Sequence, residues 1–251
     1  MKHGPRLMVG NWKQNTTVGE GVRLARQIGA GMIAGAGCIV LPPFPHIPMV
    51  HEELKSTVVG IGAQDVSPFA SGAHTGDVGA DMLLDWCEYV LVGHSERRTM
   101  YGESNHLIRE KLGRIVDQGM TPILAVGEDA SVRSAGNSAR HVREQLAGSL
   151  GADGGVPLKA LVIAYEPLWA IGTGTPADDQ TVSEMVEAIR EWGDSHIPDE
   201  TSVTVLYGGS VAPSNAAGIF AIDGVDGALV GGSSLNAEDF VALQHILAGH
   251  V

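Results

Sequence analysis

Hydrophobic residues follow two alternating patterns along the chain. Short apolar runs predict buried strands, and the segments between them repeat hydrophobic residues every three to four positions, as amphipathic helices do. Strands are expected at residues 7–10, 38–41, 58–63, 89–92, 122–126, 160–165, 203–207 and 227–230. Helices are expected at residues 18–33, 47–54, 80–86, 105–117, 139–150, 181–192, 215–220 and 237–247.

The regular alternation of strand and helix predicts the fold class. Strands joined by single helices run parallel, and eight such units close into an α/β barrel of the (β/α)8 type. An open doubly wound sheet is the alternative, but it usually has a glycine-rich first turn. Here the first strand is followed by Asn11, Trp12, Lys13 and Gln14. No linker interrupts the pattern, so residues 1–251 are expected to form one domain.

Composition and charge narrow the class of protein. An apolar content of 44% in 251 residues supports a large core, and no apolar run is long enough to span a membrane. The chain has two cysteines, Cys38 and Cys87, each in or beside a strand, which favours core thiols and a reducing cytoplasm. A formal charge of −13 argues against nucleic acid as a partner. It also means that an anionic substrate needs a local cation.

A carboxylate stands at the end of the sixth predicted strand, directly before a loop of unusual composition. Glu166 ends an apolar run, and Pro167 cannot continue the strand. The loop then contains Trp169 and closes with Gly172 and Gly174, which allow sharp turns. Such a loop suits a lid over a catalytic base, although the same residues could form an ordinary surface connection.

Other polar or glycine-rich segments also follow predicted strands. In a parallel barrel the carboxyl ends of all strands open on one face, so these segments should converge there. Asn11 and Lys13 follow the first strand, and His94 follows the fourth. The seventh and eighth strands are followed by Gly208-Gly209-Ser210 and Gly231-Gly232-Ser233. This convergence predicts a functional site at the carboxyl end of the barrel.

Together these segments resemble the triosephosphate isomerase family, in order and spacing, over nearly the whole chain. The resemblance implies an intramolecular aldose–ketose isomerase of glycolysis and gluconeogenesis that uses no metal and no cofactor. It would interconvert dihydroxyacetone phosphate and D-glyceraldehyde 3-phosphate through an enediolate. The segments that carry the resemblance are Asn11-Trp12-Lys13, Gly93-His94-Ser95-Glu96-Arg97-Arg98, residues 164–174, Tyr207-Gly208-Gly209-Ser210 and Val230-Gly231-Gly232.

The resemblance implies catalytic roles for four residues. As in the family, Glu166 would be the base and a neutral His94 would donate to the substrate oxygens. Backbone N–H groups near His94 would disfavour its cationic form. Lys13 would face the phosphate and the developing oxyanion, and Asn11 would donate to a substrate oxygen. Without a catalytic role, Glu166 would be a strand-end carboxylate paired with a neighbour, His94 a structural histidine and Lys13 a solvated surface residue.

Further residues are implied around these four. Backbone N–H groups of Gly172, Ser210, Gly231 and Gly232 would hold the phosphate, the last pair at the start of a helical turn. Glu96 would pair with Lys13.

The family's lid and dimer also have counterparts here. The lid would include Pro167, Trp169 and Gly174, and Tyr207 and Ser210 would hold it by hydrogen bonds. The loop at residues 64–79 would enter a second subunit, where Thr75 supports the active site. The resemblance therefore implies a homodimer.

Several residues differ from those frequent in the family, among them Gln14, His74, Ala125 and Ser233. Because of these differences two other functions remain open. One is an isomerase of a four-carbon keto-sugar phosphate of the erythrulose phosphate type, and the other is a non-catalytic phosphate-binding protein. We expect the pocket volume near Ile171, Leu235 and Ala125 to separate the three-carbon from the four-carbon substrate.

Overall fold

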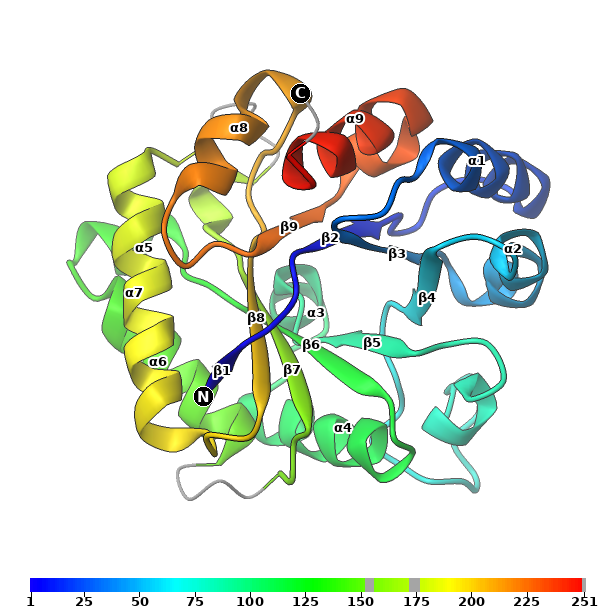
Figure 1. Ribbon diagram of the computed structural model, residues 1–251. Coiled ribbons are helices and arrows are strands. Elements are labelled where there is room, and N and C mark those ends of the chain that lie inside the picture. The colour runs from blue at the N-terminus through cyan, green and yellow to red at the C-terminus, as the bar shows by residue number, and fades with distance from the viewer. Residues whose placement is uncertain (152–155, 172–176, 250–251) are drawn as a thin grey trace.

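A closed ring of parallel strands forms the centre of the molecule, and helices surround it (Figure 1). The computed structural model describes residues 1–151, 156–171 and 177–249. Neighbouring strands pair in chain order from β2 to β9, and β9 also pairs with β2, which closes the barrel. The two-residue strand β1 (Lys2–His3) pairs with β8 outside this ring. The predicted (β/α)8 barrel is confirmed.

Each predicted strand and helix has a counterpart in the barrel. The eight barrel strands are β2 (Leu7–Asn11), β3 (Gly37–Leu41), β4 (Val59–Ala63), β5 (Tyr89–Val92), β6 (Thr121–Val126), β7 (Ala160–Tyr165), β8 (Ser202–Tyr207) and β9 (Gly227–Val230). The α-helices are α1 (Val18–Gly31), α2 (Ile47–Leu54), α3 (Ser95–Met100), α4 (Asn105–Asp117), α5 (Ala130–Ser134), α6 (Ser138–Leu150), α7 (Asp179–His196), α8 (Pro213–Ala221) and α9 (Ala237–Leu247). Short 3-10 turns are η1 (Phe44–His46), η2 (Ala80–Leu83), η3 (Leu168–Ala170) and η4 (Gly232–Leu235).

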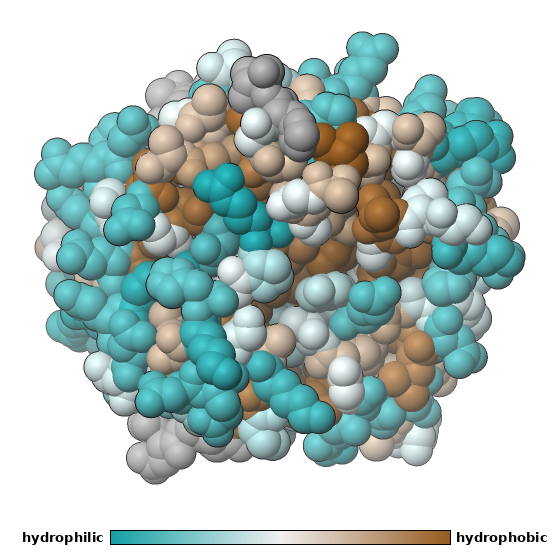
Figure 2. All heavy atoms as spheres, in the orientation of Figure 1, coloured by the Kyte–Doolittle hydropathy of each residue, from teal (hydrophilic) through white to brown (hydrophobic). Residues whose placement is uncertain are grey.

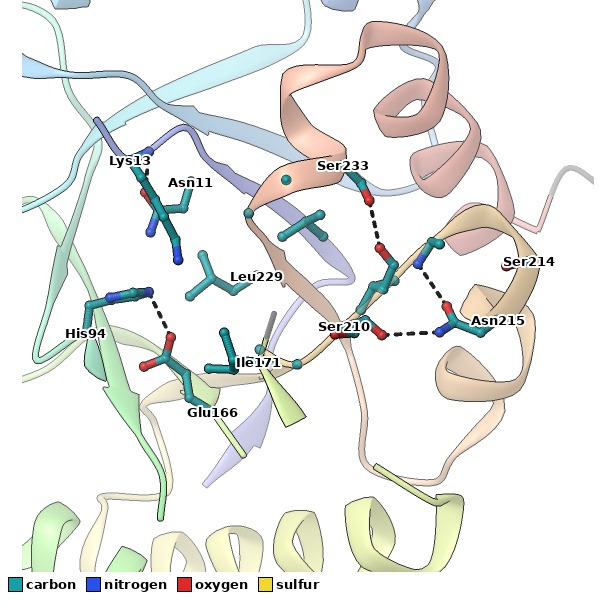
Figure 3. Close-up of a pocket in the computed structure, with 17 residues that line it drawn as sticks. Asn11, Lys13, His94, Glu166, Ile171, Ser210, Ser214, Asn215, Leu229 and Ser233 are labelled. Carbon is teal, nitrogen blue, oxygen red and sulfur yellow. Dashed lines mark hydrogen bonds and ion pairs between the residues drawn. The ribbon is translucent and has the colours of Figure 1, made fainter. Parts of the chain in front are cut away.

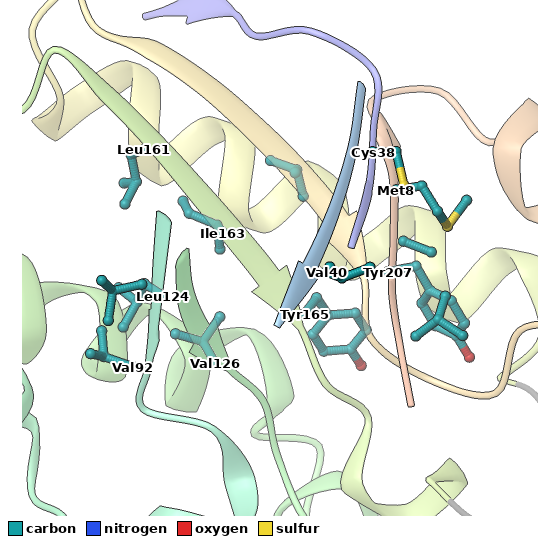
Figure 4. Close-up of a cluster of buried hydrophobic side chains, with 14 of the residues drawn as sticks. Met8, Cys38, Val40, Val92, Leu124, Val126, Leu161, Ile163, Tyr165 and Tyr207 are labelled. Carbon is teal, nitrogen blue, oxygen red and sulfur yellow. The ribbon is translucent and has the colours of Figure 1, made fainter. Parts of the chain in front are cut away.

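The strands separate two hydrophobic layers because successive side chains point to opposite faces. On β2, Leu7 and Val9 belong to a small cluster inside the barrel, whereas Met8 belongs to the larger cluster between strands and helices. Figure 4 shows part of this outer cluster, including Leu124 and Ile163. Each such aliphatic side chain, fully buried, contributes roughly 1.5–3 kcal/mol of hydrophobic free energy. The two layers together fix the strand ends that carry the site.

The structure differs from the predicted elements in a few places. Val58 is 61% exposed, and β4 therefore begins one residue later than expected. The helix expected at 80–86 is the short turn η2. The helices expected from periodicity include neither α3, which buries only Ser95, nor α5, which buries no residue and so has no hydrophobic periodicity. Its start is set instead by Asp129, whose side chain accepts from the N–H groups of Ser131 and Val132.

In Figure 2 polar residues cover most of the outer rim, where the helices lie, and hydrophobic residues are visible mainly between these polar side chains. Among the described residues no helix has the length and apolar character needed to cross a membrane.

Candidate active site

A pocket of about 410 Å³ opens at the carboxyl ends of the strands. It contains Asn11, Lys13, His94 and Glu166, which follow or end three different strands (Figure 3). The side chains of Lys13, His94 and Glu166 point toward one another across this space. The described glycine-rich segments after β8 and β9 line the opposite wall: Gly208, Gly209, Ser210, Gly231, Gly232 and Ser233.

Lys13 is held in an unusual backbone conformation. Its φ is 53°, in the left-handed region that costs a non-glycine residue about 1–3 kcal/mol. Two side chains fix it there. Asn11 Oδ1 accepts from the Lys13 N–H at 3.1 Å, and Gln64 Nε2 donates to the Lys13 carbonyl at 2.9 Å. The ammonium lies 2.6 Å from Glu96 Oε1, so Asn11, Gln64 and Glu96 together orient Lys13.

His94 precedes α3 and caps its first turn. Its Nδ1 accepts from the Glu96 N–H at 3.3 Å, which requires a free lone pair on that nitrogen. The proton of a neutral imidazole therefore belongs on Nε2, and Nε2 lies 2.9 Å from Glu166 Oε1. The backbone thus selects the tautomer whose Nε2–H donates into the pocket.

Glu166 is 2% exposed and lies at the end of β7. Its Oε2 accepts from the Ser95 N–H at 2.8 Å, while Oε1 faces His94. Burial raises the pKa of Glu166, but His94, the Ser95 N–H and the charge of Lys13 outweigh it and hold the pKa below its ordinary value. In this arrangement Glu166 is an ionised carboxylate whose oxygens are already engaged.

The far wall of the pocket offers small residues and backbone groups. A side chain at Gly232 would meet no atom within 4 Å, so the backbone there is open to a ligand. Asn215 orders the neighbouring loop, since its Nδ2 donates to the Ser210 carbonyl at 3.2 Å and its Oδ1 accepts from the Ala212 N–H at 2.9 Å. Lys13 is the only lysine or arginine among the described residues that line this pocket.

Comparison with known proteins places this site in a family. The family model for triosephosphate isomerase matches residues 6–247. The chain belongs to the triosephosphate isomerase family. Two relatives and one solved structure illustrate how far the similarity to this family extends.

The triosephosphate isomerase of Thermus thermophilus is 45% identical, with 96% of this chain and 98% of the relative covered. The triosephosphate isomerase of Azoarcus sp. is 41% identical, with 95% and 97% covered. A crystal structure of triosephosphate isomerase from Bartonella henselae has a TM-score of 0.86 and 34% identity, with 96% of this chain and 98% of that chain covered. The predicted family, isomerase class and barrel are confirmed.

Some of the residues predicted to form the lid belong to the described part of the chain and others do not. Gly172 and Gly174 lie outside the described residues. On the segment before them, Trp169 Nε1 donates to Glu128 Oε1 at 3.0 Å, and Ser210 Oγ donates to the Ala170 carbonyl at 3.0 Å.

On the segment after them, the Ala177 N–H donates to the Tyr207 hydroxyl at 3.2 Å. Tyr207 and Ser210 therefore contact the two flanks of the segment 172–176, and Pro167 begins its first flank.

Two expectations about pocket size are wrong. Of the three residues expected to control the volume, only Ile171 lines the pocket. Ala125 is fully buried in the cluster inside the barrel, and Leu235 packs against the outer hydrophobic layer. The residue that reaches the pocket from the barrel interior is Leu229, which the sequence patterns do not distinguish from other core leucines.

Thr75 lies in the exposed part of the loop 64–79 and does not line the pocket of its own chain. Within the described residues no group of three or more His, Cys, Asp or Glu side chains is arranged to hold a metal ion.

Proposed function

We propose that this chain interconverts dihydroxyacetone phosphate and D-glyceraldehyde 3-phosphate, with Glu166 as the base. One observation carries the proposal. A buried carboxylate, an imidazole with Nε2 as its donor and an ammonium group, delivered by different strand ends, line one pocket opposite Gly231 and Gly232. This is the set of groups that removal of a weakly acidic carbon-bound proton requires.

The geometry supports a sequence of events at Glu166. To reach a substrate carbon, the carboxylate has to leave the Ser95 N–H and His94, which now stabilise its ionised form. Burial then remains as the main influence on its pKa, and burial makes a carboxylate more basic. The carboxylate would become a stronger base as it reaches the substrate.

The enediolate that results carries negative charge on two oxygens. The Nε2–H of His94 and the ammonium of Lys13 point into the same space and would stabilise it without reorganising. Asn11 would serve mainly to hold the Lys13 backbone, since its Oδ1 is bonded there, and its amide NH₂ stays available as a donor to substrate. Glu96 would restrain the Lys13 ammonium.

The phosphate would bind at the opposite wall. Backbone N–H groups at Ser210, Gly231 and Gly232 lie beside this part of the pocket, and the last two begin the turn η4. By the family resemblance, Gly172 would contribute a further N–H, and Tyr207 and Ser210 would hold the lid, which includes Pro167, Trp169 and Gly174, over the bound substrate.

A coupled assay with purified protein tests the substrate. We expect kcat/KM for the two triose phosphates to exceed that for a four-carbon keto-sugar phosphate, because Ile171 and Leu229 flank the reacting groups. The opposite ranking would favour the four-carbon isomerase. Phosphate binding without any turnover would favour a binding protein.

A homodimer is part of the same proposal. Three large hydrophobic side chains on or beside the loop 64–79 are between 44% and 59% exposed, namely Phe69, Met82 and Leu84. Exposure of large hydrophobic side chains to water is unfavourable for a single chain and is typical of an interaction surface. A groove of about 470 Å³, bounded by Gln14, Glu96 and Tyr101, adjoins Lys13. The loop of a second copy, with Thr75 at its exposed end, would fill this groove.

The cellular setting is also proposed. Cys38 and Cys87 are both buried free thiols, which fits a reducing cytoplasm. There the enzyme would act in glycolysis and gluconeogenesis. Nucleic acid is not expected as a partner of a chain with a formal charge of −13.

A further inference from the structure

A second cavity reaches Glu166 from behind the substrate pocket. This rear cavity has a volume of about 170 Å³ and is lined by residues of α3, α6 and the segment after β6. Glu166 is the one described residue that lines both the rear cavity and the substrate pocket. The carboxylate therefore forms part of the partition between two cavities.

The two oxygens of this carboxylate face different sides. Oε1 lies 2.9 Å from Nε2 of His94, which lines the substrate pocket. Oε2 accepts from the N–H of Ser95, which lines the rear cavity. A proton taken from substrate on the front side would reach the border of the rear cavity when the carboxyl group returns to the Ser95 N–H, the position that it has in this structure.

The rear cavity is suited to water. Its mouth is formed by the exposed residues Thr99 and Asp129 and the half-buried His141, all of which have polar side chains. At about 30 Å³ per molecule, it has room for roughly five waters with polar groups to bind them. A polar, open cavity of this size holds water rather than remaining empty.

We propose that the rear cavity is the route by which a proton on Glu166 exchanges with solvent while substrate fills the front pocket. This rests on the proposed role of Glu166 as the base. The protonated carboxyl gives its proton to a cavity water, and a solvent proton returns to the same group. The protonation state of Glu166 and all bonds of the substrate are unchanged, so only the identity of the proton differs.

Isotope exchange during turnover measures this route. When the reaction runs in deuterium oxide, a proton that stays on Glu166 returns to the product as hydrogen, and one that exchanges is replaced by deuterium. Proton NMR of the product gives the deuterated share. The rear cavity predicts that blocking its mouth lowers this share without a matching loss of turnover.

Thr99→Leu fills the mouth and is matched by Thr99→Val. Both remove the hydrogen bond from Thr99 Oγ1 to the Ser95 carbonyl, 2.8 Å long, but only leucine lengthens the side chain. We expect Thr99→Leu to lower the deuterated share about twofold or more, because transfer through water needs a hydrogen-bonded molecule beside the carboxyl. Thr99→Val should retain the wild-type share.

His141→Trp is a second, independent block, and His106→Trp is its control on an exposed helix position, where the histidine side chain is 82% exposed. An unchanged deuterated share in both Thr99→Leu and His141→Trp, with normal turnover, would overturn the rear route. The proposed function fails in a different way, namely by normal turnover in a Glu166→Gln variant.

Discussion

Glu166 is held as an ionised carboxylate by two neighbours rather than by exposure to water. The Ser95 N–H and His94 each contact one of its oxygens in a site where only 2% of the residue is exposed. The same contacts lower its pKa and, in the proposed reaction, would keep it from the substrate. At the residue scale, the proposed reaction requires Glu166 to exchange these contacts for the substrate proton.

Ser95→Pro removes the Ser95 N–H at a position where the backbone suits proline, and the ring Cδ then takes the place of the N–H beside the carboxylate. Ser95 is the first residue of α3, where proline is well tolerated, and His94 has φ −53° and ψ 141°, the extended conformation favoured before proline. Ser95→Pro deletes a donor to the ionised carboxylate, so the pKa of Glu166 should rise. Activity should then be lost at a higher pH on acidification, as measured by kcat/KM against pH.

Ser95→Ala is the control, because it removes the hydroxyl and retains the N–H. On the acid side, its profile of kcat/KM against pH should match that of the wild type. The substrate phosphate titrates near pH 6 and contributes equally to the profiles of the wild type and both variants. Superimposable profiles for Ser95→Pro and the wild type would show that this hydrogen bond does not set the pKa.

The length of the Glu166 side chain is a second residue-scale test. Glu166→Asp retracts the carboxylate by one methylene, and a misplacement of about 1 Å can cost about 10²-fold in rate. We expect kcat to fall by at least that factor with a smaller change in KM. Turnover close to the wild-type value would remove Glu166 from the mechanism.

At the scale of elements, the segment after β6 supports the end of β7. Gln145 of α6 binds both the N–H and the carbonyl of Gly127, at 2.8 and 3.0 Å. The backbone of Glu166 passes so close that a Cβ on Gly127 would lie 1.8 Å from the Glu166 carbonyl oxygen. Gly127 is therefore needed for the crossing of two chain segments, one of which carries Glu166.

Gly127→Ala should shift this crossing. Overpacking of this kind typically costs about 1–3 kcal/mol of unfolding free energy, and the displaced backbone carries Glu166 with it. We expect both the stability in urea and kcat to fall. A variant with full stability and full activity would contradict the close approach.

Gly113→Ala is the matched control. Gly113 lies within α4, and a Cβ there would meet no atom within 4 Å. Alanine should stabilise this helix by roughly 0.5–1 kcal/mol and leave kcat unchanged.

At the scale of the whole molecule, the barrel brings the site together and leaves the loop 64–79 outside it. Lys13, His94 and Glu166 are far apart in sequence and meet because parallel strands place their carboxyl ends on one face. That residues 1–251 fold as one domain stays a prediction, which a single cooperative unfolding transition would support.

Thr75→Arg tests the proposed dimer. An extra charged side chain at the exposed part of the loop should not fit a groove in a second copy, so the sedimentation coefficient should shift toward that of a monomer on dilution. The activity should fall together with the dimer. Gln118→Arg, at an exposed position after α4, is the control and should change neither.

The sequence by itself determined the barrel and the principal side chains of the site. Hydrophobic periodicity is a local property, so it predicted the eight strands and most of the helices, but not α3, which buries only Ser95, or α5, which buries no residue. Glu166, His94 and Lys13 were found because each directly follows or ends a predicted strand within a family-like segment. The position of Leu229 in the pocket wall was not predicted, because the sequence around a core leucine is the same whether or not the residue borders a pocket.

Only the tertiary structure decided how these groups act on one another. The Ser95 N–H and Glu166 are 71 positions apart, and their hydrogen bond depends on the relative height of two strand ends. The rear cavity likewise arises where α3, α6 and the segment after β6 fail to fill the space behind Glu166. Distances between strand ends and the gaps between packed helices are set by the whole barrel, and no local pattern of residues encodes them.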